Sequence, residues 1–322
     1  MSLIEQILNR LEEIKSPADR GQFSLFQLPD MDSNIFYGKN TDNQVVFATY
    51  SQNSRLKSSL QKTRKLIFWF NAKCDISIDG QSLVNHMNVL TCLSCSESEV
   101  TAFIRLTLAF AEGMEEQDTS KLYELFSALT RLFADERKIN QAELQGFFGE
   151  LYIIRHYHEL GLNLSDYWQK KEKLNFDFSL SESKKVEIKS TAKEIRVHRF
   201  KHEQLLSDLY NICIISIMMR PDDAGLSLYQ LISEVQRISS GNFYTLVYIE
   251  NFIKAFDEDE LKSIRYDSLF IERRLRVYRA EDVPRFEDEQ PRGVSRTEYD
   301  SDLSTSPFMS DSDFVIWARS TD

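Results

Sequence analysis

The 322-residue sequence lacks the features of several large protein classes. No basic leader is followed by an apolar segment, and no apolar run approaches the roughly 20 residues that cross a membrane. The cysteines are too few and too scattered for a disulfide framework; they are Cys74, Cys92, Cys95 and Cys213. Because such frameworks are typical of oxidising compartments, these absences together predict a cytoplasmic protein without a membrane-inserted part.

Sequence motifs of several enzyme classes are also missing. There is no glycine-rich phosphate loop, no Gly-x-Ser-x-Gly elbow and no Cys/His nucleophile pattern. The stretch Cys92–Cys95 forms a single CxxC, which carries little weight as a zinc or redox site without a second pair. His198 and His202 have a spacing that could ligate zinc on a helix, but the basic residues around them disfavour a cation.

The chain does contain enough apolar side chains for a large core. Hydrophobic residues make up 42% of it and aromatic residues 12%, which excludes wholesale disorder. At this length we expect two domains, a β-rich N-terminal domain over residues 1–115 and an α/β domain over residues 116–322 with an acidic C-terminal extension. The strand-like runs of the first zone are residues 23–28, 44–50, 65–70, 74–78 and 89–93.

Beyond this zone the pattern becomes helical and then mixed. Apolar periodicity and turn residues predict, besides a first helix over 3–14, a helical zone over 100–160, a strand buried on both faces over 209–218, a helix over 226–238, an ambiguous stretch over 242–256 and a strand over 269–278. The last forty or so residues are rich in turn signals. Helices alternating with a hairpin and a buried strand are typical of a mixed α/β core.

One constellation of charged residues follows the helical zone. Asp177 and Glu187 flank the turn-like residues 181–184, so a hairpin would set the two carboxylates side by side. In the period-two pattern of residues 185–191, Glu187 and Lys189 emerge on one face while their apolar neighbours enter a core. Two adjacent carboxylates suit Mg²⁺ or Mn²⁺.

A Glu-x-Lys triplet is by itself a weak signal in a chain that is 28% charged. Glu13-Ile14-Lys15 has the same spacing, but it ends a helical pattern in which residues two apart point away from each other. The triplet at residues 187–189 differs because both of its charged side chains share one face of a strand. The alternative is a solvated hairpin with an incidental ion pair.

Glu150 lies beside the apolar stripe of the helix before the hairpin. The stripe consists of Leu144, Phe147, Phe148, Leu151, Ile154 and Tyr157. Such a carboxylate is either partly desolvated for a function or an edge residue whose stem packs while its oxygens reach water. Gly146 and Gly149 weaken helix propensity by roughly 1 kcal/mol each, and we expect them to let this helix approach a sheet closely.

The order helix glutamate, strand aspartate and strand Glu-x-Lys resembles the PD-(D/E)XK nuclease superfamily, which has the restriction-endonuclease-like fold. Strictly, the resemblance covers the middle third of the chain. More loosely, the whole chain is similar to the bacterial PD-(D/E)XK motif proteins through residues 149–151, 186–191, 196–198, 203–205 and 291–294. Phe176 stands where the superfamily name places a proline, but many relatives lack that proline, and the change leaves the metal ligand untouched.

The resemblance implies hydrolysis of phosphodiester bonds, with DNA as the expected substrate. Asp177, Glu187 and the backbone carbonyl of Ile188 would hold Mg²⁺ or Mn²⁺. Lys189 would orient the attacking water and offset the negative charge that develops in the transition state.

Two further positions are assigned through the same resemblance. Glu150 would position a water or reach a second metal. Gln204 stands where the superfamily often carries a residue that contacts substrate or steadies the catalytic lysine. Members of the group accompany phage-defence or restriction systems, so an ATPase or helicase is an expected partner. Duplex cutting by one centre per chain would require a homodimer or sequential nicks.

The net charge of −11 is the main argument against a nucleic-acid partner, because proteins that bind phosphates usually show a basic surface. The distribution is uneven. Residues 184–202 carry seven basic side chains against two acids, a net +5, whereas residues 281–322 carry four against eleven, a net −7. We expect Lys193, Arg196 and His198 to contact substrate phosphate, and the acidic end to be solvated or to engage a partner protein.

Three functional hypotheses remain open. The chain is a Mg²⁺-dependent DNA endonuclease in a defence or repair assembly, a non-catalytic nucleic-acid-binding protein of the same fold, or a scaffold whose acidic surface contacts other proteins. The joint presence of Asp177, Glu187 and Lys189 favours the first, because a protein that no longer cleaves has no need for all three.

Overall fold

The computed structural model describes residues 2–19, 22–29, 34–51, 57–78, 81–112, 119–133, 139–168, 176–206, 209–286 and 297–320. The chain forms two compact units. The first, here called the barrel unit, comprises Met1–Glu136 and Ser240–Phe252, and the second, the sheet unit, comprises Arg137–Ser239 and Ile253–Asp322. The expected boundary at residues 115 and 116 falls outside the described residues, and the first unit continues beyond it. Among the described helices, none is long and apolar enough to cross a membrane.

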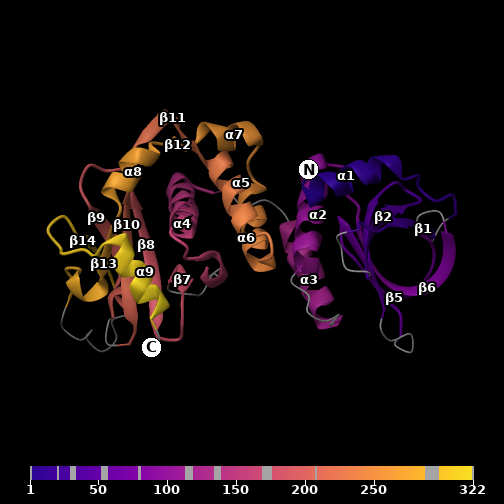
Figure 1. Ribbon diagram of the computed structural model, residues 1–322, viewed down its shortest axis with the longest axis horizontal. Coiled ribbons are helices and arrows are strands. Elements are labelled where there is room, and N and C mark those ends of the chain that lie inside the picture. Colours follow the sequence, from indigo (N-terminus) through magenta and orange to yellow (C-terminus); the bar gives the residue numbers. More distant parts are fainter. Residues whose placement is uncertain are drawn as a thin grey trace. The chain divides into compact units, whose positions relative to one another are not determined.

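Six strands form the sheet of the barrel unit, and all of them except β4 close into a ring. They are β1 (Gln22–Phe26), β2 (Ile35–Asn40), β3 (Val45–Tyr50), β4 (Ser59–Lys62), β5 (Leu66–Ile78) and β6 (Gln81–Cys92). The sheet runs β1-β2-β3-β6-β5-β4, and β1 also pairs in parallel with the second half of β5, so the sheet closes on itself. Figure 1 shows this ring, with β4 extending it along the first half of β5.

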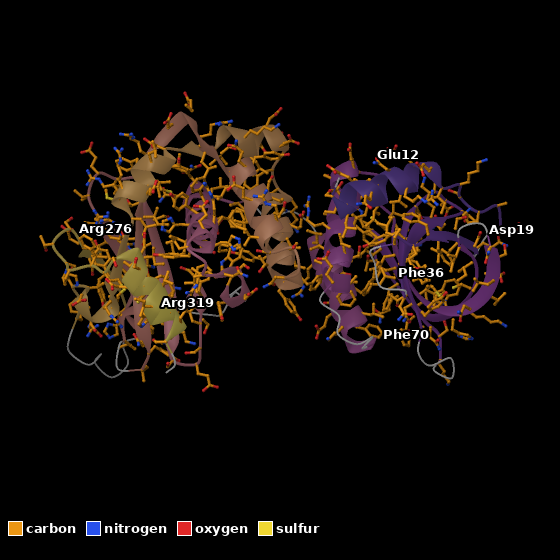
Figure 2. The ribbon with its side chains drawn as sticks, in the orientation of Figure 1. Glu12, Asp19, Phe36, Phe70, Arg276 and Arg319 are labelled. Carbon is orange, nitrogen blue, oxygen red and sulfur yellow. The ribbon has the colours of Figure 1, made fainter. Side chains whose placement is uncertain are left out.

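The inside of the ring is filled by apolar side chains. Ala72, Cys74 and Ile76 of β5 point inward. The pairing register shifts between Trp69 and Ala72, at Asn71, whose φ is 47°. Because of this shift, inward-pointing side chains occur both before and after Asn71. Phe36 of β2 lies among the same side chains (Figure 2). The two runs expected over 65–70 and 74–78 are therefore one bent strand, because a bulge changes direction without ending a strand.

Helices cover the outer face of the ring. They are α1 (Leu3–Glu13), α2 (Glu97–Glu112) and α3 (Thr119–Leu132), and α6 (Phe243–Ile253) packs on α2 through the rings of Phe243 and Phe110. The hydroxyl of Tyr37 on β2 bonds to Thr107 of α2 at 2.9 Å. The ambiguous stretch 242–256 is the helix α6, and an ion pair between Arg105 and Glu250 joins it to α2.

The sheet unit is a mixed α/β structure. Its central sheet has the order β13-β10-β8-β7, in which β8 and β10 are parallel and both outer pairs are antiparallel. The strands are β7 (Phe178–Ser179), β8 (Lys184–Thr191), β10 (Asn211–Met218) and β13 (Arg276–Arg279), and a second, two-stranded sheet pairs β9 (Val197–Lys201) with β14 (Glu298–Asp302). The hairpin expected between Asp177 and Glu187 is present, and β10 is buried along its length after Asn211, as predicted.

The central sheet lies between two layers. Helix α4 (Gln141–Glu159) packs on the face that carries Val186, Ile188 and Ser190, where a Cβ at Gly149 would lie 3.4 Å from Ser190. The opposite face is covered by β9, β14 and the 3₁₀ turn η2 (His202–Leu205). Figure 1 shows β9 and β14 on the side of the sheet away from α4. Glu187 and Lys189 belong to this opposite face because side chains alternate along β8.

Short elements complete the sheet unit. They are the 3₁₀ turns η1 (Ser165–Tyr167) and η3 (Ala280–Asp282), the strand pair β11 (Pro221–Ser227) and β12 (Arg265–Tyr266), and the helices α5 (Leu228–Ile238), α7 (Glu258–Ser263), α8 (Ser268–Arg274) and α9 (Asp311–Arg319). The helix predicted over 226–238 is α5.

One expectation for the C-terminal part was wrong, and another gains detail. The strand expected over 269–278 is the helix α8 followed by the short strand β13, and Asp267 caps α8 by accepting a bond from the backbone N–H of Phe270 at 2.9 Å. The acidic end is folded rather than simply solvated. Phe314 of α9 and Leu303 after β14 are fully buried. Residues 291–294 lie outside the described part of the chain.

Lys184 shows how α9 is held. Its Nζ donates to the carbonyl oxygens of Trp317 and Ser320 and to the Ser320 hydroxyl at the C-terminal end of the helix. A cation at this end satisfies carbonyl groups that have no helical partner. The first residue of β8 is thus bound to the last helix of the chain.

Alanine substitutions at two glycines should have opposite effects on the free energy of unfolding. A Cβ at Gly38 would lie 1.9 Å from the carbonyl oxygen of Ser24, so Gly38→Ala should lower the free energy of unfolding of the barrel unit by about 1–3 kcal/mol. No atom from elsewhere in the described chain lies within 4 Å of a Cβ at Gly146 in α4, so Gly146→Ala should raise that of the sheet unit by about 0.5–1 kcal/mol. Chemical denaturation of both variants, followed unit by unit, measures this. Equal effects would contradict the packing at Gly38.

Candidate active site

The candidate site lies at the β7 edge of the central sheet. Asp177 immediately precedes β7, and the pairing of Phe178 with Val186 places it beside β8. The backbone N–H of Ile188 donates to Oδ2 of Asp177 at 2.6 Å. In an extended strand the N–H and C=O of one residue point to the same side, so the carbonyl of Ile188 also faces the Asp177 side of β8.

Glu187, Lys189 and Gln204 form one bonded group. Nζ of Lys189 lies 2.7 Å from Oε1 of Glu187 and donates to Oε1 of Gln204 at 3.0 Å. Nε2 of Gln204 donates to the same Glu187 oxygen at 2.6 Å. The backbone N–H of Lys201 donates to Oε1 of Gln204 at 3.1 Å, which fixes the orientation of the amide in η2. Gln204 thus bridges the strand acid and the strand lysine.

Glu150 reaches this edge from the other face of the sheet. It stands on α4, and its Oε2 accepts a bond of 2.6 Å from the indole N–H of Trp168. Some of its surface remains accessible, whereas its carboxyl group is enclosed closely enough to lose most of its hydration. Its charge acts on both Asp177 and Glu187. The structure therefore brings together Glu150, Asp177, Glu187, Lys189 and Gln204, as the sequence predicted; their chemical roles stay predictions.

The three carboxyl groups oppose one another's ionisation. Burial raises the pKa of Glu150 to about 7, with a smaller rise from Glu187 and a decrease from the Trp168 bond. Burial and the charges of Glu187 and Glu150 raise the pKa of Asp177 well above its usual range. Burial also raises the pKa of Glu187, although Lys189 and Gln204 oppose the rise. A positive charge placed among these groups would stabilise their ionised forms.

Arg196 and His198 lie inside the protein, which corrects their assignment to substrate phosphate. Arg196 is 7% exposed and donates to the carbonyl and hydroxyl oxygens of Ser216 and to the carbonyl of Arg274. Nε2 of His198 bonds to the Ser216 hydroxyl at 2.7 Å. Burial and the neighbouring Arg196 lower the pKa of His198 to about 3, so its ring is neutral at pH 7. Both side chains serve an internal polar network.

The rest of the basic stretch is also largely engaged. Lys184 binds the end of α9, Lys185 bonds to Ser179 and to the carbonyl of Ser181, and Arg199 pairs with Asp300. Lys193, in the loop after β8, is exposed, and its side chain remains a candidate for phosphate contact. The net positive charge counted along residues 184–202 does not form one open basic surface.

The donor set at the sheet edge fits a hard divalent ion. In the described part of the chain, no group of three or more His, Cys, Asp or Glu side chains is placed to hold a metal. Two carboxylates, Asp177 and Glu187, and the backbone carbonyl of Ile188 supply oxygen donors, and Mg²⁺ typically keeps several waters beside one or two protein carboxylates. Burial raises the pKa of both acids, and a divalent cation bound between them would oppose that rise.

Comparison with known protein families gives one match, over residues 7–304, to the family described as "Putative PD-(D/E)XK family member (DUF4420)". The chain belongs to this family. Searches of curated proteins and of solved structures found no match. Membership suggests a nuclease, and the match spans both the barrel unit and the sheet unit.

Two residues of the site were missed by sequence reasoning. Trp168 and Ser216 contact Glu150 and His198 respectively. Trp168 follows the 3₁₀ turn η1, far from the motif, and no periodicity marks it. Ser216 could have been noticed as the polar residue in the apolar run of β10, because a buried hydroxyl needs a partner.

The raised pKa of Glu150 predicts a pH-dependent stability. The folded protein holds a proton on Glu150 up to about pH 7, the unfolded chain only up to about 4.5. This stabilisation is complete below pH 4.5 and is lost as the pH rises through 7, by on the order of 3 kcal/mol. Glu150→Gln should weaken this pH dependence in denaturation of the sheet unit. Glu159→Gln, on the exposed side of α4, is the control; identical profiles for the two variants would contradict the burial of the Glu150 charge.

Proposed function

We propose that the protein is a Mg²⁺- or Mn²⁺-dependent nuclease that hydrolyses DNA phosphodiester bonds. The observation that carries this proposal is the group of Asp177, Glu187 and Lys189 at one sheet edge, with Gln204 bonded to both Glu187 and Lys189. A mixed sheet with α4 on one face is compatible with the restriction-endonuclease-like arrangement that we propose for the sheet unit. Family membership supports the same activity.

The position of each residue suggests its role in the proposed reaction. Asp177, Glu187 and the carbonyl of Ile188 would hold the metal ion, which when bound polarises a phosphate oxygen and acidifies a water. The ammonium group of Lys189, held by two oxygen acceptors, would orient the attacking water and stabilise negative charge developing on the phosphate. Gln204 would keep Lys189 from rotating away.

Glu150 would act on the attacking water. With a pKa of about 7 it can accept or release a proton near neutral pH, which suits a group that positions and deprotonates a water. Its charge acts on Asp177, so Glu150 lies near the proposed metal ligands. Among the described residues, however, the three carboxyl groups are not placed to hold one metal ion together. A second metal at Glu150 is not needed for this role.

The setting of the activity is part of the proposal. The sequence contains no ATPase motif. The choice of a cutting site would therefore come from a partner, such as an ATPase or helicase of a restriction, phage-defence or repair system in the cytoplasm. Cutting of both strands of a duplex would require a homodimer or sequential nicks. The alternative is a member that binds nucleic acid, or scaffolds other proteins, without cleavage. The internal use of many basic residues favours the scaffold form of this alternative, whereas the carboxylate group favours the nuclease.

Cleavage assays test the activity directly. With Mg²⁺ or Mn²⁺ the native protein should cut plasmid or linear DNA, and Asp177→Ala and Lys189→Ala should each lower the rate roughly 10²- to 10³-fold, because each removes a group needed to stabilise transition-state charge. Glu182→Ala, an exposed acid in the turn between β7 and β8, is the matched control and should cleave normally. Unchanged cleavage in both site variants would eliminate the assignment, and calorimetry without uptake of either metal would point to the non-catalytic alternative.

Lys193 and Arg196 should differ in DNA binding despite their equal charge. Lys193→Ala should weaken binding and reduce the slope of log K against log salt by about 1, because one exposed phosphate contact is lost. Arg196→Met should leave that slope unchanged but lower the free energy of unfolding by roughly 1–3 kcal/mol, because it strips buried oxygens of their donor. Binding isotherms at several salt concentrations and denaturation curves measure both. A salt slope altered by Arg196→Met alone would contradict its internal role.

A further inference from the structure

Trp168 contacts two different parts of the candidate site. Its indole N–H donates to Oε2 of Glu150 at 2.6 Å, and its backbone forms an antiparallel bridge with Phe178, the residue after Asp177. Trp168 is 4% exposed. A single residue after η1 therefore contacts the acid on the helix and the strand that directly follows the other acid.

Ring packing fixes the plane of the indole. The centroid of the Trp168 ring lies 6.2 Å from that of Phe147, one turn before Glu150 on α4, and the planes are inclined by 24°. The Phe178 ring lies at 6.4 Å from it, and these two planes are inclined by 16°. Two nearly parallel aromatic neighbours restrain the indole in the orientation in which its N–H donates to Glu150.

The edge position of β7 makes such a support necessary. This strand has only two residues and pairs with β8 alone among the named strands, so little backbone bonding holds Asp177 against Ile188. The bridge from Trp168 adds a partner on the free side of β7. Positioned groups in a site depend on such outer contacts, whose loss typically lowers metal affinity or activity roughly 10- to 100-fold.

We infer that Trp168 is a positioning residue that holds Glu150 and Asp177 in one arrangement, Glu150 through the indole N–H and Asp177 through the support of β7. The inference rests on the proposed function for its effect on cleavage, whereas the contact itself can be tested without any activity. Trp317 supplies a matched control within the sheet unit: it is 6% exposed and its indole N–H donates to Oδ1 of Asn211 at 3.0 Å, away from the carboxyl groups.

The contact is tested by nuclear magnetic resonance of the three indole N–H groups in the full chain. The cross peaks are assigned with single Trp→Phe variants of Trp69, Trp168 and Trp317. Measured well above pH 7, where the Glu150 carboxyl is ionised, Glu150→Gln should shift the Trp168 peak upfield, because a charged acceptor is replaced by a neutral one, and should leave the Trp317 peak in place. Glu159→Gln, on the same helix, should move neither. A Trp168 peak that does not respond to Glu150→Gln overturns the inference.

The effect on the site is tested with Trp168→Phe, which keeps a stacking ring and removes the donor. Cleavage with Mg²⁺ should fall roughly 10- to 100-fold, whereas Trp317→Phe should stay within about threefold of the native rate. In a Glu150→Gln background Trp168→Phe should cause no comparable further loss, because it acts through Glu150. Denaturation curves of both variants verify folding.

The outcomes separate the two proposals. Equal cleavage by Trp168→Phe and Trp317→Phe, or losses that multiply fully in the double variant with Glu150→Gln, would show that Trp168 only supports the fold and would overturn the inference. A native protein that neither cleaves DNA nor takes up Mn²⁺ would eliminate the proposed function instead, and the indole shift would then decide the positioning of Glu150 by itself.

Discussion

The sheet unit holds three carboxyl groups where each loses water and opposes the charge of the others. Glu150 approaches Asp177 and Glu187 from the opposite face of the sheet, and all three have raised pKa values. Such an arrangement is stable only if donors are supplied, and the chain supplies them from four places: a strand N–H, a lysine, a glutamine in a 3₁₀ turn and an indole. The surrounding elements bring these donors to one edge of the central sheet.

The face of the sheet behind the site continues this polar character. Lys189 of β8 pairs in register with Ser216 of β10. The Ser216 hydroxyl accepts a hydrogen bond from Arg196 and bonds to His198. Arg196 and His198 thus bond to the same hydroxyl, and two of the basic side chains counted in the sequence are used inside the protein instead of on its surface.

The parts predicted from sequence are those decided by local periodicity. The alternation in residues 185–191 fixed which side chains of β8 share a face, and the turn residues fixed the hairpin, so Asp177, Glu187 and Lys189 were correctly placed together. Charge counting failed because it cannot distinguish a surface cation from Lys184 or Arg196, which are used internally. The helix α8 was mistaken for a strand because its capping aspartate lies just outside the apolar run, and the closing of the ring depends on β1 pairing with distant β5.

The path of the chain constrains how the two units can be separated. The candidate site lies wholly within the sheet unit, yet residues 240–252 leave that unit between α5 and α7 to complete the barrel unit. There Leu246 of α6 is buried in the apolar cluster that covers the ring, and Glu250 pairs with Arg105. Removing the barrel unit would therefore expose an apolar helix in the middle of the sheet unit's chain. The family match covers both units as well, so a shortened chain designed to keep the sheet unit folded has to keep residues 240–252 together with their apolar partners in the barrel unit.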